Sequence, residues 1–123
     1  MANEVVVECG NVVDILAMPI GLAGEVNHLL KLHNLSAPVM EVKGVARSSW
    51  AFFCSPREMA HGKEVVKTLA VHRIAHFGSG ARVPLPPSPA GNGHALRWVV
   101  QPSQAPLPLW ATVAYCALQA IRR

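Results

Sequence analysis

The chain has 123 residues, the length of one domain, so we expect a single domain. Hydrophobic residues make up 51% of it and charged residues only 15%, a composition that excludes a disordered chain and indicates a globular domain with some apolar surface covered by a partner. The net charge of +4 permits contact with nucleotides or nucleic acid, but the basic residues are scattered and form no basic arm.

The three cysteines predict a reducing compartment. Cys9, Cys54 and Cys116 are odd in number, widely separated and flanked by apolar residues, which is typical of buried thiols rather than of a disulfide framework. The first residues include acids where a signal peptide needs basic residues, and the apolar run at 106–121 is too short to span a bilayer. We therefore expect a cytoplasmic protein with no membrane contact.

The first third of the chain reads as strand, helix, strand. Residues 4–9 and 12–18 are β-branched runs separated by a Gly-Asn dipeptide, which predicts a strand or a strand pair. Apolar residues recur at helical spacing over 20–33, and 38–45 returns to a strand pattern. This order is a βαβ-like opening, and the sequence leaves open whether its strands are parallel neighbours.

The middle of the chain predicts an aromatic strand, a helix and another strand. Residues 50–54, WAFFC, favour a strand antiparallel to the preceding one. The Ser-Pro-Arg-Glu run at 55–58 has the features of a helix start, with serine as cap and proline at the first helical position. We expect this helix to continue to about Leu69 and a short strand to follow over 71–77.

The stretch Gly78 to Trp98 concentrates the most constrained residues of the sequence. Its glycines and prolines predict a Gly-rich turn, a short strand, a proline corner, a second Gly turn and a returning strand. Turn chemistry alone explains each glycine and proline, so a structural corner and a ligand-binding loop both stay open.

The last third predicts a strand at 95–100, a proline-rich linker at 101–108 and a helix at 109–121 with Trp110 on its apolar face. The whole pattern indicates an α/β (α+β) fold: a single small domain whose mixed or antiparallel sheet is flanked by about three helices. Residues 1–102 would form the core, and residues 103–123 the linker and a C-terminal docking helix.

Few polar residues of the sequence are candidates for binding a metal or another ligand. Asp14 is the single charge in its run, and it is either a structural carboxylate or a ligand for metal or phosphate chemistry. His72 and His76 are four residues apart, but no cysteine or acid near them completes a metal site, so two surface histidines are favoured. The strong sequence signatures of zinc and nucleoside triphosphate sites are absent.

Three segments resemble one known family. They are CG…VDILAMP at 9–19, WAFFCSP at 50–56 and GSGARVPLPPS at 78–88, closing on Gly93 and Arg97-Trp98. Together they are similar to the later part of the N-terminal domain of bifunctional primase-polymerases, the prim-pol branch of the archaeo-eukaryotic primase superfamily. The resemblance covers residues 9–102 and implies a primase-polymerase-like core whose N-terminal portion is missing.

In that family an Asp-x-Asp pair holds divalent metal, and a later Ser-x-His motif binds the incoming triphosphate. Asp14 matches the first acid, but Leu16 or Ala17 occupies the position of the second. Near the aromatic strand only Ser48 and Ser49 remain of the serine-histidine motif. Because two-metal phosphoryl transfer needs several carboxylates, the resemblance implies a catalytically inactive relative with no catalytic residues and no metal site.

The expected function is therefore a primase-polymerase-like domain without polymerase activity that binds nucleotide, nucleic acid or a protein partner. It needs no cofactor, and Mg²⁺ or Mn²⁺ would matter only if residual activity exists. The candidate ligand-binding residues, taken from the resembling motifs, are Asp14, Arg47, Ser48, Arg82 and Ser88.

Two alternatives stay open. In the first, the chain is a small protein-interaction or regulatory module that binds no nucleotide and forms a homo-oligomer or another complex through the Trp110 face of its C-terminal helix. In the second, it is an active nucleotidyltransferase, which requires that further acids from Glu4, Glu8 or Glu41 converge on Asp14 in space.

Overall fold

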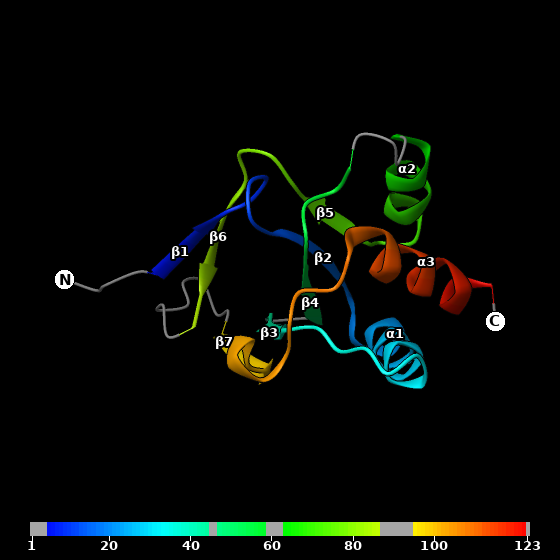
Figure 1. The fold of residues 1–123 in the computed structure, drawn as a ribbon, viewed down its shortest axis with the longest axis horizontal. Helices are drawn as coiled ribbons and strands as arrows, with labels where there is room; N and C mark the ends of the chain where they lie inside the picture. The colour runs from blue at the N-terminus through cyan, green and yellow to red at the C-terminus, as the bar shows by residue number, and fades with distance from the viewer. Residues whose placement is uncertain (1–4, 45–46, 59–62, 87–94, 123) are drawn as a thin grey trace.

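The computed structural model describes residues 5–44, 47–58, 63–86 and 95–122. These residues form seven strands, three α-helices and one 3-10 turn (Figure 1). In chain order the elements are β1 Val5–Glu8, β2 Asp14–Pro19, α1 Ile20–Leu32, β3 Val39–Lys43, β4 Ser48–Cys54, α2 Lys63–Val71, β5 Ala75–Phe77, β6 Arg82–Leu85, β7 Ala95–Val100, η1 Pro102–Gln104 and α3 Trp110–Ile121.

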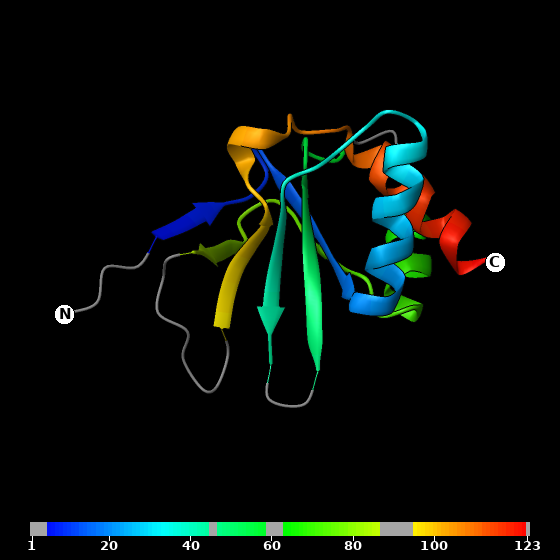
Figure 2. The same ribbon diagram turned by 90° about the horizontal axis from the view of Figure 1, so that it is seen from below.

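Five of the strands form one antiparallel sheet, in the order β5-β2-β4-β3-β7. The remaining two, β1 and β6, pair with each other as a separate antiparallel ribbon (Figure 2). The predicted α+β class with an antiparallel sheet and three helices is confirmed, as is the antiparallel pairing of the aromatic strand β4 with its predecessor β3.

The centre of the sheet is built from two interleaved strand-helix-strand units. One runs β2-α1-β3 and the other β4-α2-β5, and β4 lies between the two strands of the first unit. This connectivity is the split βαβ arrangement of ferredoxin-like folds. Strands β2 and β3 are therefore parallel but not neighbours, because each pairs antiparallel with β4.

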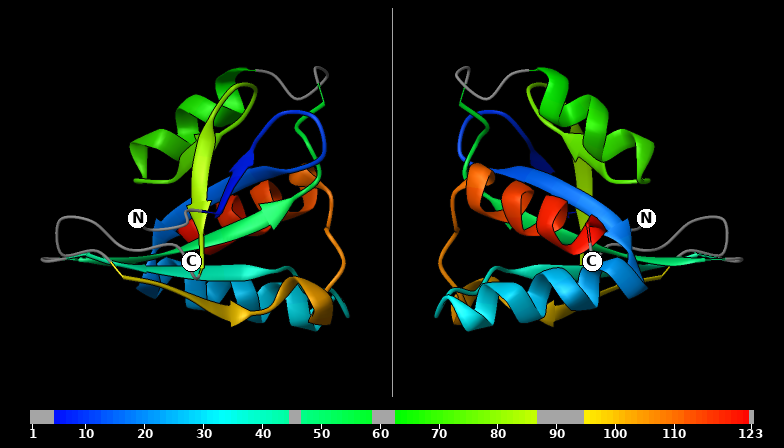
Figure 3. Two further views of the ribbon diagram at one scale, coloured as in Figure 1. Left: turned by 90° about the vertical axis from the view of Figure 1, so that its left-hand side faces the viewer. Right: turned by 90° about the vertical axis from the view of Figure 1, so that its right-hand side faces the viewer.

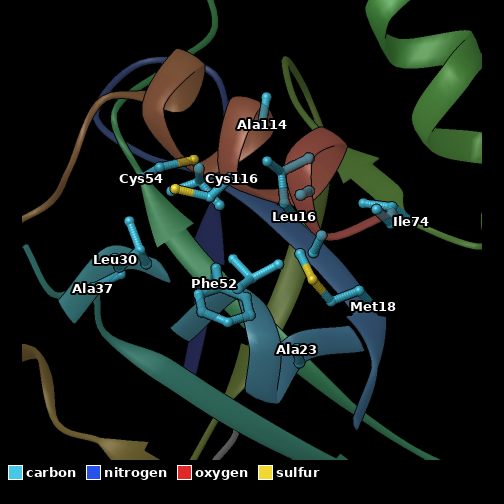
Figure 4. Packing of buried hydrophobic residues seen from close by; sticks show 14 of the residues in the cluster. Leu16, Met18, Ala23, Leu30, Ala37, Phe52, Cys54, Ile74, Ala114 and Cys116 are labelled. Carbon is cyan, nitrogen blue, oxygen red and sulfur yellow. The ribbon is translucent and has the colours of Figure 1, made fainter. Parts of the chain in front are cut away.

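The three helices cover one face of this sheet, and α3 lies between α1 and α2 (Figure 3). Leu16 and Met18 of β2 and Phe52 of β4 are buried there among side chains of the helices (Figure 4). Trp110 of α3 is 2% exposed in the same cluster. The predicted docking helix thus docks on its own domain, so the Trp110 face is not available to a partner.

The other face carries a smaller cluster, partly covered by the β1-β6 ribbon. Ile15 and Phe53 are buried in it, and Val7 and Val83 of the ribbon pack against it. The ribbon meets the sheet at Gly10, whose φ is +112° and whose amide donates to the carbonyl of Val13. Strands β1 and β2 on either side of this turn do not pair, because they belong to different sheets.

The predicted helix start at 55–58 is wrong. This segment is not helical, and α2 is described from Lys63 onward. Two of its backbone amides have tertiary partners instead: Ser55 donates to the carbonyl of Pro108, and Arg57 donates to the carboxylate of Asp14. Local cap chemistry predicts a helix here, but the segment is non-helical and two of its amides form hydrogen bonds to distant residues.

The strand predicted over 71–77 is also shorter than expected. Helix α2 continues to Val71, a turn follows, and the strand begins only at Ala75. In the Gly78 to Trp98 stretch, β6 and β7 both form as predicted, but they pair with β1 and β3 rather than with each other. Pro84 of the proline corner lies in β6 and Pro86 follows this strand, whereas the rest of the corner and the second Gly turn lie at 87–94, outside the described residues.

None of the helices in the described part of the chain is long and apolar enough to cross a bilayer. Within the same residues, all three cysteines are buried and free, as the sequence predicts.

Helix α1 contains an exposed glycine that offers a first prediction. A Cβ at Gly24 would meet no atom within 4 Å. Because glycine in a helix interior is less favourable than alanine, we expect Gly24→Ala to stabilise the fold by about 0.5–1 kcal/mol. Thermal unfolding should show a higher Tm, and a lower Tm would contradict the exposed placement of this position.

Candidate functional site

Asp14 is a buried carboxylate at the first position of β2. It is 2% exposed, and its Oδ2 accepts a hydrogen bond from Nε2 of His76 at 2.7 Å. The same oxygen accepts the backbone N–H of Arg57 at 3.0 Å. When the carboxylate is ionised it can only accept, and Nε2 is then the donor. The sequence predicted a surface histidine at 76, but its side chain is 12% exposed and is hydrogen-bonded to Asp14.

The pocket around the His76 ring is shaped by two neighbours. A Cβ at Gly78 would lie 3.0 Å from Cε1 of His76 and 3.5 Å from Oδ2 of Asp14, so a larger residue would crowd the pair. On the other side the ring contacts Trp110 edge to face, with centroids 5.5 Å apart. The imidazole is therefore held between the carboxylate and the core.

The other carboxylate oxygen of Asp14, Oδ1, is buried and has no hydrogen-bond partner among the described residues. It does not belong to a metal centre there, because no three His, Cys, Asp or Glu side chains in the described ranges lie close enough to hold an ion. Glu8 lies on the ribbon opposite Arg82, and Glu41 pairs with Arg97 at 3.0 Å. These acids do not join Asp14, and Glu4 lies outside the described residues.

The cysteines near Asp14 are poor nucleophiles. Burial raises the pKa of the Cys54 thiol far above its ordinary value, and the charge of Asp14 raises it further. Burial and then Asp14 also raise the pKa of Cys9. Both thiols stay protonated at neutral pH, and a protonated thiol neither attacks substrates nor binds metal readily. The Sγ–H of Cys54 donates to the backbone carbonyl of Asp14 at 3.4 Å, which is a structural contact.

A second feature is an open pocket of about 340 Å³ on the sheet face opposite the helices. We call it the two-arginine pocket. Strand pairing brings part of its lining together. Ala17 of β2 lies opposite Ala75 of β5, and Pro19 of β2 lies opposite Ser49 of β4. The lining residues are Ala17, Met18, Pro19, Arg47, Ser48, Ser49, Arg73, Ala75 and Phe77.

The charged residues that line the two-arginine pocket are all positive. Arg47 reaches it from the turn between β3 and β4, and Arg73 from the turn between α2 and β5. Its lining contains no acid, and neither guanidinium has a salt-bridge partner among the described residues. Two unneutralised guanidinium groups beside hydroxyls attract anions, and they suit phosphate oxygens in particular.

The structure separates the four described residues among the five expected to bind a ligand. Arg47 and Ser48 line the two-arginine pocket. Asp14 lies on the opposite, helix-covered face of the sheet, and Arg82 lies on the β1-β6 ribbon. Ser88 is outside the described residues.

Sequence reasoning missed Arg73, Ser49 and Phe77 as members of the pocket, and it missed His76 as the partner of Asp14. Ser49 directly follows the candidate Ser48 in the sequence, and this adjacency could have identified it. Arg73 and Phe77 reach the pocket through the pairing of β5 with β2. That pairing joins segments about sixty residues apart, and no local pattern in the sequence encodes it.

No family model, curated protein or solved structure matches the chain.

Proposed function

We propose that the chain is a non-catalytic domain of primase-polymerase type that binds a nucleotide in the two-arginine pocket. The observation that carries this proposal is the charge of the pocket: two arginines and two serines line it, without any acid. A cleft of about this size with a few convergent polar groups is the usual form of a small-molecule site.

The lining of the pocket offers groups for both the phosphates and the base of a nucleotide. Arg47 and Arg73 can each form charge-assisted hydrogen bonds to phosphate oxygens, and the hydroxyls of the serines can donate to the same group. Phe77 also lines the pocket and is 38% exposed, two positions after Ala75 on the same side of β5. An exposed aromatic ring in the lining of a pocket is suited to stacking of a base.

The resemblance to the prim-pol family supports the same location. In that family a serine-histidine motif binds the incoming triphosphate, and Ser48 and Ser49 stand where this motif would be. Both serines line the two-arginine pocket. The resemblance also matches Asp14 to the first metal-binding acid, but the carboxylate of Asp14 is paired with His76 on the face of the sheet opposite the pocket.

That separation favours binding without turnover. Metal-assisted phosphoryl transfer needs carboxylates beside the phosphate to hold the ions. The lining of the two-arginine pocket supplies none. We therefore expect nucleotide binding that does not depend on Mg²⁺.

Isothermal titration with ATP tests the proposal. We expect Arg47→Ala to weaken ATP binding about tenfold or more, because a charge-assisted hydrogen bond to phosphate is lost. Adenosine, which lacks the phosphates, should bind weakly to the unchanged protein and equally weakly to the variant. Addition of Mg²⁺ or of EDTA should leave the ATP affinity nearly unchanged.

The matched control is Arg82→Ala. It removes the same positive charge from the ribbon, away from the pocket, so any effect of net charge is equal in the two variants. ATP affinity in this control should change by less than about twofold. Equal losses in both variants would contradict the site, and tighter binding of a short single-stranded DNA than of ATP would make nucleic acid the ligand. Absence of any binding, with the mass of a dimer in solution, would favour the protein-interaction alternative.

A further inference from the structure

Helix α2 ends in a turn whose geometry is defined by two hydrogen bonds. The amide of Ile74 donates to the carbonyl of Leu69 at 3.0 Å, and the amide of Arg73 donates to that of Ala70 at 3.0 Å. This is the Schellman motif, which places the residue after the helix cap in the left-handed backbone region. Arg73 occupies that position, with φ of +66°.

Helix α1 ends in the same motif and provides an internal comparison. Leu35 donates to the carbonyl of Leu30 at 2.8 Å, and Asn34 donates to that of Lys31 at 3.0 Å. The left-handed residue here is Asn34, with φ of +57°. Glycine and asparagine are the residues that usually fill this position, so α1 follows the rule and α2 departs from it with Arg73.

No salt bridge within the described residues offsets the strained backbone of Arg73. Arg73 is exposed and forms no salt bridge with any described residue. Its side chain lines the two-arginine pocket. Strained backbone that the local packing does not explain is found preferentially where a side chain is needed for function.

The Schellman motif also fixes the backbone position of Arg73. Leu69 and Ile74, which flank the turn, are 0% and 1% exposed in the main core. The backbone of Arg73 is thus anchored on both sides, directly before the β5 strand that borders the pocket. Because the backbone of Arg73 is already ordered, binding does not have to order it, which favours affinity.

We propose that Arg73 is a residue that determines affinity for the phosphates of the ligand and that its position is kept at the expense of fold stability. This inference rests on the proposed nucleotide site. It differs from that proposal in assigning a second, separately testable phosphate contact and in predicting opposite effects of one substitution on stability and on binding.

The test is Arg73→Gly, studied by thermal unfolding and by titration with ATP. Glycine adopts the left-handed conformation without strain, so we expect Tm to rise by about 3 °C. Loss of the guanidinium should weaken ATP binding about tenfold, while adenosine binding stays unchanged. The matched control is Asn34→Gly, which changes the equivalent position of α1, away from the pocket, and should leave ATP affinity as it was.

The outcomes separate the two proposals. If Arg47→Ala loses ATP affinity while Arg73→Gly retains it, the role of Arg73 is wrong and the nucleotide site stands. A lower Tm for Arg73→Gly would overturn the strain argument, because it would show that the arginine stabilises its own turn. If the unchanged protein binds no ATP, both proposals fail together.

Discussion

His76→Ala is expected to destabilise the domain by about 2–3 kcal/mol, because a buried carboxylate oxygen would lose its side-chain hydrogen-bond partner. The carboxylate of Asp14, which is 2% exposed in the unchanged protein, would keep the amide of Arg57 as a hydrogen-bond donor but lose that of His76. The edge-to-face contact with Trp110 would be lost as well. Urea unfolding followed by circular dichroism measures the difference in the free energy of unfolding.

His72→Ala provides the matched control. His72 lies four residues earlier, is exposed, and has no such partner in the described part of the chain, so its removal should change stability by less than about 0.5 kcal/mol. The double variant Asp14→Ala/His76→Ala should be more stable than the sum of the single effects predicts, by about 1 kcal/mol. Similar losses for the two histidines, or strict additivity for the pair, would show that the hydrogen bond contributes little.

Gly10→Ala is expected to be about as destabilising, by about 3 kcal/mol or more, for a different physical reason. The φ of +112° is unfavourable for any residue with a Cβ. The added Cβ would also lie 2.5 Å from the backbone Cα of Ser79, and backbone cannot rotate away as a side chain can. The ribbon must shift relative to the sheet, which disturbs the pairing of Gly80 N–H with the carbonyl of Cys9 at 3.1 Å.

The comparison that isolates this effect is Gly24→Ala, the same chemical change in helix α1, which should raise Tm. A loss of stability in Gly10→Ala together with a gain in Gly24→Ala would show that the effect depends on the position of the glycine and not on the kind of substitution. A Gly10→Ala variant as stable as the unchanged protein would mean that the close approach to Ser79 is not needed. Scanning calorimetry of the three proteins at one pH provides both values.

Sequence periodicity predicted most of the individual elements. Helix α1 was expected over 20–33 and lies at Ile20–Leu32, and α3 was expected over 109–121 and lies at Trp110–Ile121. Both are long and strongly periodic, which makes the apolar pattern decisive. The start of α2 was wrong because Ser55 and Arg57 give their amides to tertiary partners, an effect that no local pattern encodes.

The candidate site was predictable only in part. Arg47 and Ser48 are neighbours in the sequence and remain neighbours in the pocket. Arg73 depends on the end of α2 and on the pairing of β5 with β2, and His76 reaches Asp14 through the same pairing. Residues brought together by strand register cannot be predicted from composition or spacing, because a shift by one residue would turn each side chain to the opposite face.

The position of α3 between the other two helices also bears on how the chain is made. On a ribosome, β2, α1, β3 and β4 emerge first, and the apolar face around Leu16 and Phe52 cannot be covered by α3 until residues 110–121 have followed. During synthesis the nascent chain therefore exposes this face, a surface that chaperones recognise and that promotes aggregation. The core is completed only after α3 has emerged, and a ribosome stalled before Trp110 would carry an unfinished fold.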